Sequence, residues 1–180
     1  PVARIEIQKA VAKSDGQPRD GATVYNSVCS ACPQRLQPGV KNILETLQAD
    51  ESVLDLGCGN GHFLRELHDR RHRAALLGVD FSLPLLREAD ATPGVEFREV
   101  DLMQLSAISN QLVAVSGPWS VVSMFATLHH IPSQEMRLDI LRTLKTLLKP
   151  GGKFYLSNWQ FLNSEKLRAR VQPWSRVGLA

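Results

Sequence analysis

Hydrophobic positions follow two alternating patterns along the middle of the chain. Short apolar runs, typical of buried strands, are separated by stretches in which apolar residues recur every three or four positions, as on one face of a helix. The runs predict five strands and the repeats predict helices between them. The predicted strands are 52–56, 75–79, 95–100, 119–125 and 154–157, and the predicted helices are 40–47, 63–71, 83–89 and 134–148.

This succession of strands and helices predicts the fold class. Alternating strands and helices are typical of an α/β protein with a doubly wound, mostly parallel, Rossmann-like sheet. Ligands of such sheets bind at the carboxyl ends of the strands, where the strand order reverses. The sequence predicts one crevice there, because four features fall at strand ends: the glycine-rich loop 57–61, Asp80, Asp101 and the loop 125–132.

The ends of the chain depart from this pattern. Turn-forming residues interrupt 1–39, so we interpret that stretch as an N-terminal arm or lid and 40–180 as the ligand-binding domain. Towards the other end, Lys149, Pro150 and two glycines predict a turn that stops the long helix before the last strand, since proline cannot continue a helix.

The segment 53–61, Val-Leu-Asp-Leu-Gly-Cys-Gly-Asn-Gly, joins a buried strand to a glycine turn. Glycine tolerates unusual dihedral angles and lets a ligand approach the backbone closely. The segment therefore predicts a nucleotide-type binding loop. Its spacing differs from the Gly-x-Gly-x-x-Gly of dinucleotide sites, and an NAD-dependent oxidoreductase stands as an alternative.

Two acids follow predicted strands. Asp80 has the separation from the glycine loop at which an acid accepts hydrogen bonds from both ribose hydroxyls; the other interpretation is a helix N-cap. Asp101 could accept a hydrogen bond from the exocyclic amine of adenine, or could be a turn residue.

Composition sets broad limits. A chain of 180 residues with 43% apolar and 22% charged residues can form one domain with a sizeable core. No apolar run is long enough to span a bilayer, and the first residues lack the apolar core of a signal peptide, so we expect a cytoplasmic protein without a membrane partner. The net charge is only +3, but basic residues gather at 65–73 and 166–176, where they could meet phosphates or form solvated helix faces.

The three cysteines do not predict a disulfide framework or a metal centre. Cys29 and Cys32 form half of a zinc-type motif, and no second pair accompanies them. We expect free thiols and no metal.

Taken as a set, the motifs resemble those of the class I S-adenosylmethionine-dependent methyltransferases. The matching segments are 53–61, 78–82, 100–102 and 148–153, within about residues 40–160. The resemblance implies S-adenosylmethionine as cofactor, with the glycine loop against its methionine part, Asp80 at the ribose, and Asp101 and Leu102 beside the adenine. The implied cofactor site consists of Asp55, Gly57, Cys58, Gly59, Asn60, Gly61, Asp80, Phe81, Asp101, Leu102 and Phe125.

A narrower resemblance concerns the methyl acceptor. The segments 125–132, Phe-Ala-Thr-Leu-His-His-Ile-Pro, and 155–159 resemble the tRNA wobble-uridine methyltransferases, which esterify a 5-carboxymethyl group; 172–176 is similar to the segment that follows. This resemblance implies tRNA as partner. Trp159 and Trp174 could stack on a base or could equally be core residues near a strand end. Paired histidines also occur in small-molecule methyltransferases, so a small-molecule acceptor is the alternative.

His129 and His130 are the catalytic candidates. A carboxylate acceptor needs no base, whereas an amine or hydroxyl acceptor might need one of these imidazoles. Either histidine could instead pack beneath the cofactor. Because neighbouring loop residues usually point apart, we expect at most one of them to face the substrate.

The resemblance also implies two closing strands that the sequence does not show before Ala180. We therefore expect a sheet that lacks its last two strands, which a protein partner could complete. A non-catalytic cofactor-binding subunit is the remaining alternative.

Overall fold

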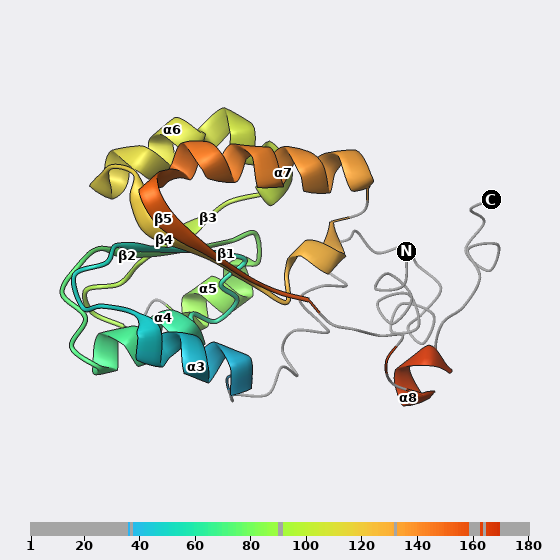
Figure 1. Ribbon diagram of the computed structural model, residues 1–180, viewed down its shortest axis with the longest axis horizontal. Helices are drawn as coiled ribbons and strands as arrows, with labels where there is room; N and C mark the ends of the chain where they lie inside the picture. Colours follow the sequence, from blue (N-terminus) through green and yellow to red (C-terminus); the bar gives the residue numbers. More distant parts are fainter. Residues whose placement is uncertain are drawn as a thin grey trace.

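A computed structural model of the chain describes residues 36, 38–89, 92–131, 133–158, 163 and 165–169. Within them, strands alternate with helices (Figure 1). The strands are β1 (Val53–Leu56), β2 (Leu76–Asp80), β3 (Glu96–Glu99), β4 (Trp119–Phe125) and β5 (Leu148–Ser157). The helices are α3 (Pro38–Thr46), α4 (His62–Asp69), α5 (Leu83–Ala89), α6 (Leu105–Ser116), α7 (Gln134–Leu147) and α8 (Glu165–Arg168), with 3-10 turns η1 (Leu102–Gln104) and η2 (Leu128–His130).

The five strands form one parallel sheet in the order β3-β2-β1-β4-β5. The strand order reverses between β1 and β4, which is the switch point at which such sheets bind ligands. Figure 1 shows α6 and α7 on one face of the sheet and α3, α4 and α5 on the other. The predicted doubly wound α/β fold is therefore confirmed.

Each face of the sheet has its own hydrophobic core. One contains Leu54 and Leu56 with residues of α6 and α7, and the other contains Val53 with residues of α3 and α4. All four residues of β1 are buried, because helices cover both faces of the strand. The end of β1, and with it the start of the loop that follows, is therefore held between two packed layers.

Most predicted elements are present with ends shifted by a few residues, but two expectations differ. The helix α6 was not predicted. The long helix stops before 149–152 as predicted, since α7 ends at Leu147, but these residues belong to β5 and do not form a separate turn before the last strand. Trp119 pairs with Leu148, and the next pair joins Val121 to Lys153, so the extra residues form a bulge. Within the described sheet, β5 is an edge strand, where proline is tolerated.

The N-terminal arm stays a prediction, since residues 1–35 lie outside the described part of the chain. The helix α3 begins at Pro38, within the stretch assigned to the arm, because proline suits the first position of a helix. Among the helices that the structure describes, none has the length and apolar character needed to cross a membrane.

Candidate active site

The glycine loop 57–61 leads from β1 into α4 at the switch point of the sheet. Gly57, Gly59 and Gly61 have φ angles of 75°, 56° and 71°, all in the left-handed region that favours glycine. The backbone N–H groups of Gly57 and Cys58 donate to the Val79 carbonyl at 2.7 and 3.0 Å. These bonds hold the loop against the end of β2.

The three glycines differ in what surrounds them. A Cβ atom on Gly57 would lie 2.4 Å from the Thr127 side chain, and one on Gly61 would lie 2.6 Å from Phe97. A Cβ on Gly59 would meet only Leu85, at 4.0 Å. Gly57 and Gly61 therefore allow close packing within the protein, whereas Gly59 leaves an open face on which a ligand can rest.

Asp80 connects the glycine loop to the end of β2. Its Oδ2 accepts a hydrogen bond from the Gly59 N–H and its Oδ1 accepts one from the Ser82 N–H, both at 2.9 Å. Asp80 is 1% exposed, and this burial raises the pKa of the carboxyl against the backbone hydrogen bonds of Ser82, Gly59 and Phe81. The two oxygens of a carboxylate offer about four acceptor positions, so Asp80 retains capacity for a ribose hydroxyl.

Asp55 lies under the loop, in β1, with 3% of its surface exposed. The Ser123 hydroxyl of β4 donates to Asp55 Oδ1 at 2.7 Å. Burial raises the pKa of Asp55 to about 7, the Ser123 hydrogen bond lowers it, and the charge of Asp80 raises it further. Sequence reasoning missed Ser123, although a hydroxyl within the apolar run of β4 was a usable signal.

Cys58 and Asn60 occupy the positions between the glycines. Burial raises the pKa of the Cys58 thiol, which lies where a Cβ on Gly78 would be only 2.8 Å away. Cys29 and Cys32 lie outside the described residues. In the part of the chain that the structure describes, no three His, Cys, Asp or Glu side chains are grouped so that they could hold a metal ion.

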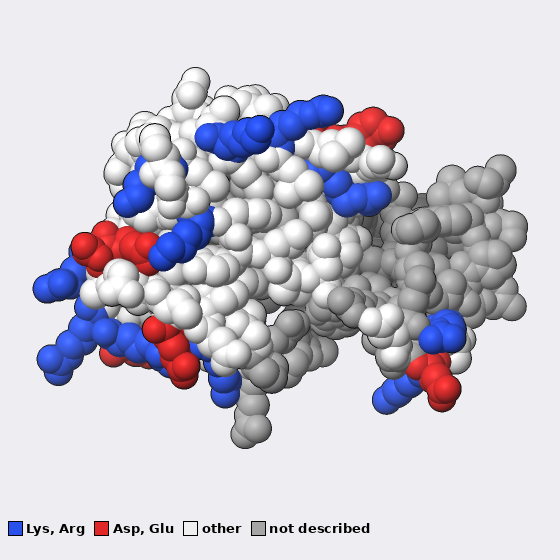
Figure 2. Space-filling view, in the orientation of Figure 1, with Lys and Arg blue, Asp and Glu red and all other residues white. Residues whose placement is uncertain are grey.

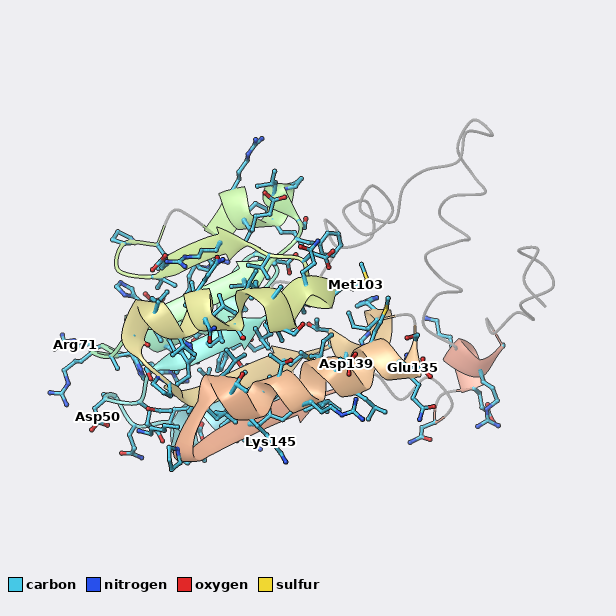
Figure 3. The ribbon with its side chains drawn as sticks, turned by 90° about the horizontal axis from the view of Figure 1, so that it is seen from above. Asp50, Arg71, Met103, Glu135, Asp139 and Lys145 are labelled. Atoms are coloured by element: carbon cyan, nitrogen blue, oxygen red, sulfur yellow. The ribbon has the colours of Figure 1, made fainter. Side chains whose placement is uncertain are left out.

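The ends of β2 and β3 carry the residues expected beside the adenine. Asp101 Oδ1 accepts a hydrogen bond from the Met103 N–H at 2.9 Å and so caps η1, with Leu102 buried behind it. Phe81 and Met103 are 37% and 52% exposed, which is high for apolar side chains. Figure 3 places Met103 at the end of the domain opposite Arg71. Phe81 and Met103 follow β2 and β3, and we call this exposed apolar pair after the neighbouring strands the apolar lip.

The loop after β4 borders the glycine loop on the other side. Phe125 stacks edge to face on Phe63 of α4, with ring centroids 5.0 Å apart. The Thr127 hydroxyl lies 3.0 Å from the Phe125 carbonyl oxygen and 3.3 Å from the Gly57 carbonyl oxygen, and its one proton can be donated to either. The Ala126 N–H donates to Ser157 at the end of β5, at 3.0 Å to the carbonyl oxygen. The loop is therefore fixed to β1 and β5 at once.

His129 and His130 lie in η2 with ring centroids 4.3 Å apart and a tilt of 40°. The expectation that they point apart is wrong, because the two rings are in contact. Burial lowers the pKa of His129, against a hydrogen bond with Asn158. Burial and the neighbouring His129 lower the pKa of His130 to about 4. Both imidazoles are therefore neutral at pH 7 and take up a proton less readily than an exposed histidine.

The arrangement defines a class of protein: a doubly wound fold with a nucleotide-type loop, an acid after β2 and a second acid after β3. Residues 30–177 match the family model described as a methyltransferase domain. The chain therefore belongs to the methyltransferase domain family.

Similar proteins include several methyltransferases. The chain is 30% identical over 115 residues to a ubiquinone biosynthesis O-methyltransferase of Albidiferax ferrireducens, which covers 61% of this chain and 41% of that protein. It is 27% identical over 139 residues to the tRNA (carboxymethyluridine(34)-5-O)-methyltransferase ALKBH8 of Mus musculus, covering 76% of this chain and 19% of that protein. The chain thus spans less than half the length of these relatives.

A solved structure agrees with this assignment. The crystal structure of an S-adenosylmethionine-dependent methyltransferase from Mesorhizobium loti is 27% identical, with a TM-score of 0.52, and covers 67% of this chain and 52% of that one. The predicted Rossmann-like methyltransferase fold and the assignment of S-adenosylmethionine as cofactor are confirmed. The open face of Gly59, next to the Asp80 carboxylate, and the apolar lip fit such a ligand.

Proposed function

We propose that the protein is an S-adenosylmethionine-dependent methyltransferase that esterifies the carboxylate of a 5-carboxymethyl group on a tRNA wobble uridine. The observation that carries the proposal is the neutral histidine pair of η2 at the edge of the cofactor crevice. A neutral imidazole keeps one ring N–H, which can donate a hydrogen bond to a carboxylate and hold it in place. The match to the mouse tRNA methyltransferase, over 76% of this chain, supports the same acceptor.

For this reaction the protein has to align the methyl donor with the acceptor carboxylate. Bound S-adenosylmethionine supplies a methyl group on a positively charged sulfur. A carboxylate oxygen forms the new C–O bond while the C–S bond breaks, and the electron pair of that bond stays on sulfur. The carboxylate loses its charge and no proton moves, so positioning of the two reactants provides most of the rate enhancement.

Different residues would bind the cofactor and the acceptor. Gly59 and Asp80 would hold the cofactor from the loop side, and Asp101, Leu102 and Phe81 would flank its adenine. Phe125 and the histidine pair lie on the side from which the acceptor must approach, because they follow β4 across the switch point.

A hydroxyl group of a small molecule is the second candidate acceptor. The similarity to the ubiquinone biosynthesis O-methyltransferase favours it. An imidazole of η2 would have to take the hydroxyl proton, and the lowered pKa of His130 makes that ring a weak base for this step. Here the product would be an ether, and one proton would pass to the imidazole.

Two parts of the proposal concern the surroundings of the domain. In the described sheet β5 pairs only with β4, so its other edge can accept a strand from a protein partner. A cytoplasmic location remains a prediction.

The two acceptors give products with different stability towards base. We would incubate the protein with methyl-labelled S-adenosylmethionine and unfractionated tRNA that lacks the methyl ester. The proposal expects label that nuclease digestion releases from the tRNA fraction and that mild alkali removes as methanol. Alkali-stable label, or label confined to a metabolite extract, would contradict the ester. Gly59→Ala serves as the control with a blocked cofactor site.

A further inference from the structure

Three arginines lie at the end of the domain opposite the cofactor crevice. Arg70, Arg71 and Arg73 belong to the connection between α4 and β2, and all three are exposed. We call them the arginine turn. Figure 3 places Arg71 at one end of the domain and Met103, near the crevice, at the other. Figure 2 shows Lys and Arg side chains gathered at the same end as Arg71, with fewer Asp and Glu among them.

The arginine turn is held in one conformation by backbone hydrogen bonds. The N–H groups of Arg73 and Ala74 donate to the Ala49 carbonyl at 2.8 and 3.2 Å, and the Arg71 N–H donates to the His68 carbonyl at 2.8 Å. The ring Nε2 of His72 lies 2.6 Å from the Glu51 carbonyl oxygen. The exposed guanidinium groups therefore extend from a fixed backbone, which reduces the entropy that a ligand must overcome.

Arg71 occupies a backbone conformation that suits glycine. Its φ angle is 62°, in the left-handed region, at the position after a helix where glycine is usual. A side chain is unfavourable there, and Ala126 is the other non-glycine residue with such an angle in the part of the chain that the structure describes. The position therefore tolerates replacement of Arg71 by glycine, which allows its charge to be tested apart from the turn.

The arginine turn has no carboxylate partner among the described residues. The ion pairs found there join Arg98 to Glu96, Arg142 to Asp139 and Lys153 to Glu51. Asp50 precedes β1 and Asp69 is the last residue of α4, but neither forms an ion pair within 4.0 Å with these guanidinium groups. The three cations are therefore available to an anionic partner.

We propose that the arginine turn binds the phosphate backbone of RNA. Guanidinium groups donate paired hydrogen bonds to phosphate oxygens, and phosphate binding releases counterions from the nucleic acid. The inference rests on the proposed RNA substrate, but it concerns a different surface. An RNA held at this end would be anchored by its backbone while its modified base reaches the crevice at the other end.

The variant Arg71→Gly distinguishes an effect on RNA binding from an effect on the stability of the fold. The variant removes one cation and relieves the unfavourable φ, so the midpoint of thermal unfolding should stay equal or rise. Binding of fluorescently labelled, unfractionated tRNA should weaken roughly three- to tenfold, and the plot of log K against log salt should become less steep by about 0.9. Arg71→Lys is the matched control and should keep most of the affinity. The variant with Arg70→Ala, Arg71→Gly and Arg73→Ala should lose about 2.7 from the slope.

Several results would overturn the proposal. An unchanged salt slope in the triple variant means that these arginines do not contact phosphate. A lower unfolding midpoint for Arg71→Gly with unchanged tRNA binding means that Arg71 stabilises the end of α4 by its charge. Loss of binding to phosphatidylserine vesicles without loss of tRNA binding would assign the surface to membranes.

The binding experiment does not depend on methyl transfer. If tRNA binds through the arginine turn but receives no methyl ester, the proposed function fails and the surface proposal survives. If the ester forms and the triple variant binds tRNA like the wild type, only the surface proposal fails. Cofactor affinity should be equal in all variants, since the turn lies away from the crevice.

Discussion

Asp55→Asn tests the buried acid under the glycine loop through the pH dependence of stability. The pKa of Asp55 is about 7, compared with an ordinary value of 3.8. This difference corresponds to about 4 kcal/mol between the protonated and ionised side chain in the folded protein. Between pH 3.8 and 7 the folded state keeps the proton that the unfolded state loses. The contribution of Asp55 to the free energy of unfolding therefore falls as pH rises through this range, and it stays constant above pH 7.

Asparagine has nearly the same shape, cannot ionise and keeps an oxygen for the Ser123 hydroxyl. We expect the free energy of unfolding of the variant, relative to wild type, to increase by up to about 4 kcal/mol between pH 4 and 7. His130 has the opposite pH dependence, but it is present in both proteins and largely cancels in the difference.

The assay is urea unfolding followed by circular dichroism at several pH values across this range. Ser123→Ala provides a control, because loss of the donor raises the pKa of Asp55 and should extend the pH dependence upwards. A difference between wild type and Asp55→Asn that does not change with pH would refute a proton held on Asp55.

Three further predictions concern the site. Asp80→Ala leaves the N–H groups of Gly59 and Ser82 without their acceptor and should weaken S-adenosylmethionine binding by about 1–3 kcal/mol, measured by calorimetry; an unchanged Kd contradicts the ribose role. Gly59→Ala should lower the free energy of unfolding by only about 1–2 kcal/mol but weaken cofactor binding at least roughly tenfold. Gly61→Ala, with its Cβ 2.6 Å from Phe97, should lower the free energy of unfolding by about 2–5 kcal/mol. Thermal unfolding and calorimetry measure both effects, and a larger loss of stability for Gly59→Ala than for Gly61→Ala would contradict the prediction. His130→Gln should be more resistant to acid than wild type, by up to about 3 kcal/mol near pH 4, because a neutral buried imidazole must take up a proton on unfolding below pH 6.5; identical acid transitions would exclude this effect.

The strands of the sheet could be predicted from the sequence because buried strands appear in it as apolar runs. β1, β2 and β4 are almost wholly buried, and such strands read as continuous hydrophobic segments. The helix α6 was missed for the complementary reason. Only Leu105 and Leu112 of its twelve residues are buried, and serines dilute the rest of the pattern.

The position of the site could be predicted, but its hydrogen bonds could not. Asp80 was expected at the ribose, and the fold shows that it also holds Gly59 and Ser82. Asp55 was expected at the cofactor, yet its partner Ser123 lies 68 residues away in the sequence. Such a pair depends on strand register, which places these residues opposite each other only after β1 and β4 have paired. The contact between His129 and His130 likewise depends on the local 3-10 turn.

The placement of Cys58 affects how the domain responds to oxidants. Thiols react with peroxide and alkylating reagents as thiolates, and burial beside two carboxyl groups keeps this thiol protonated. Its sulfur also fills the space left by Gly78. A cysteine at the centre of the cofactor loop would ordinarily make an enzyme vulnerable to inactivation by oxidation. Here the same packing that shapes the loop suppresses the reactive form, so cofactor binding should persist under oxidising conditions that modify exposed thiols.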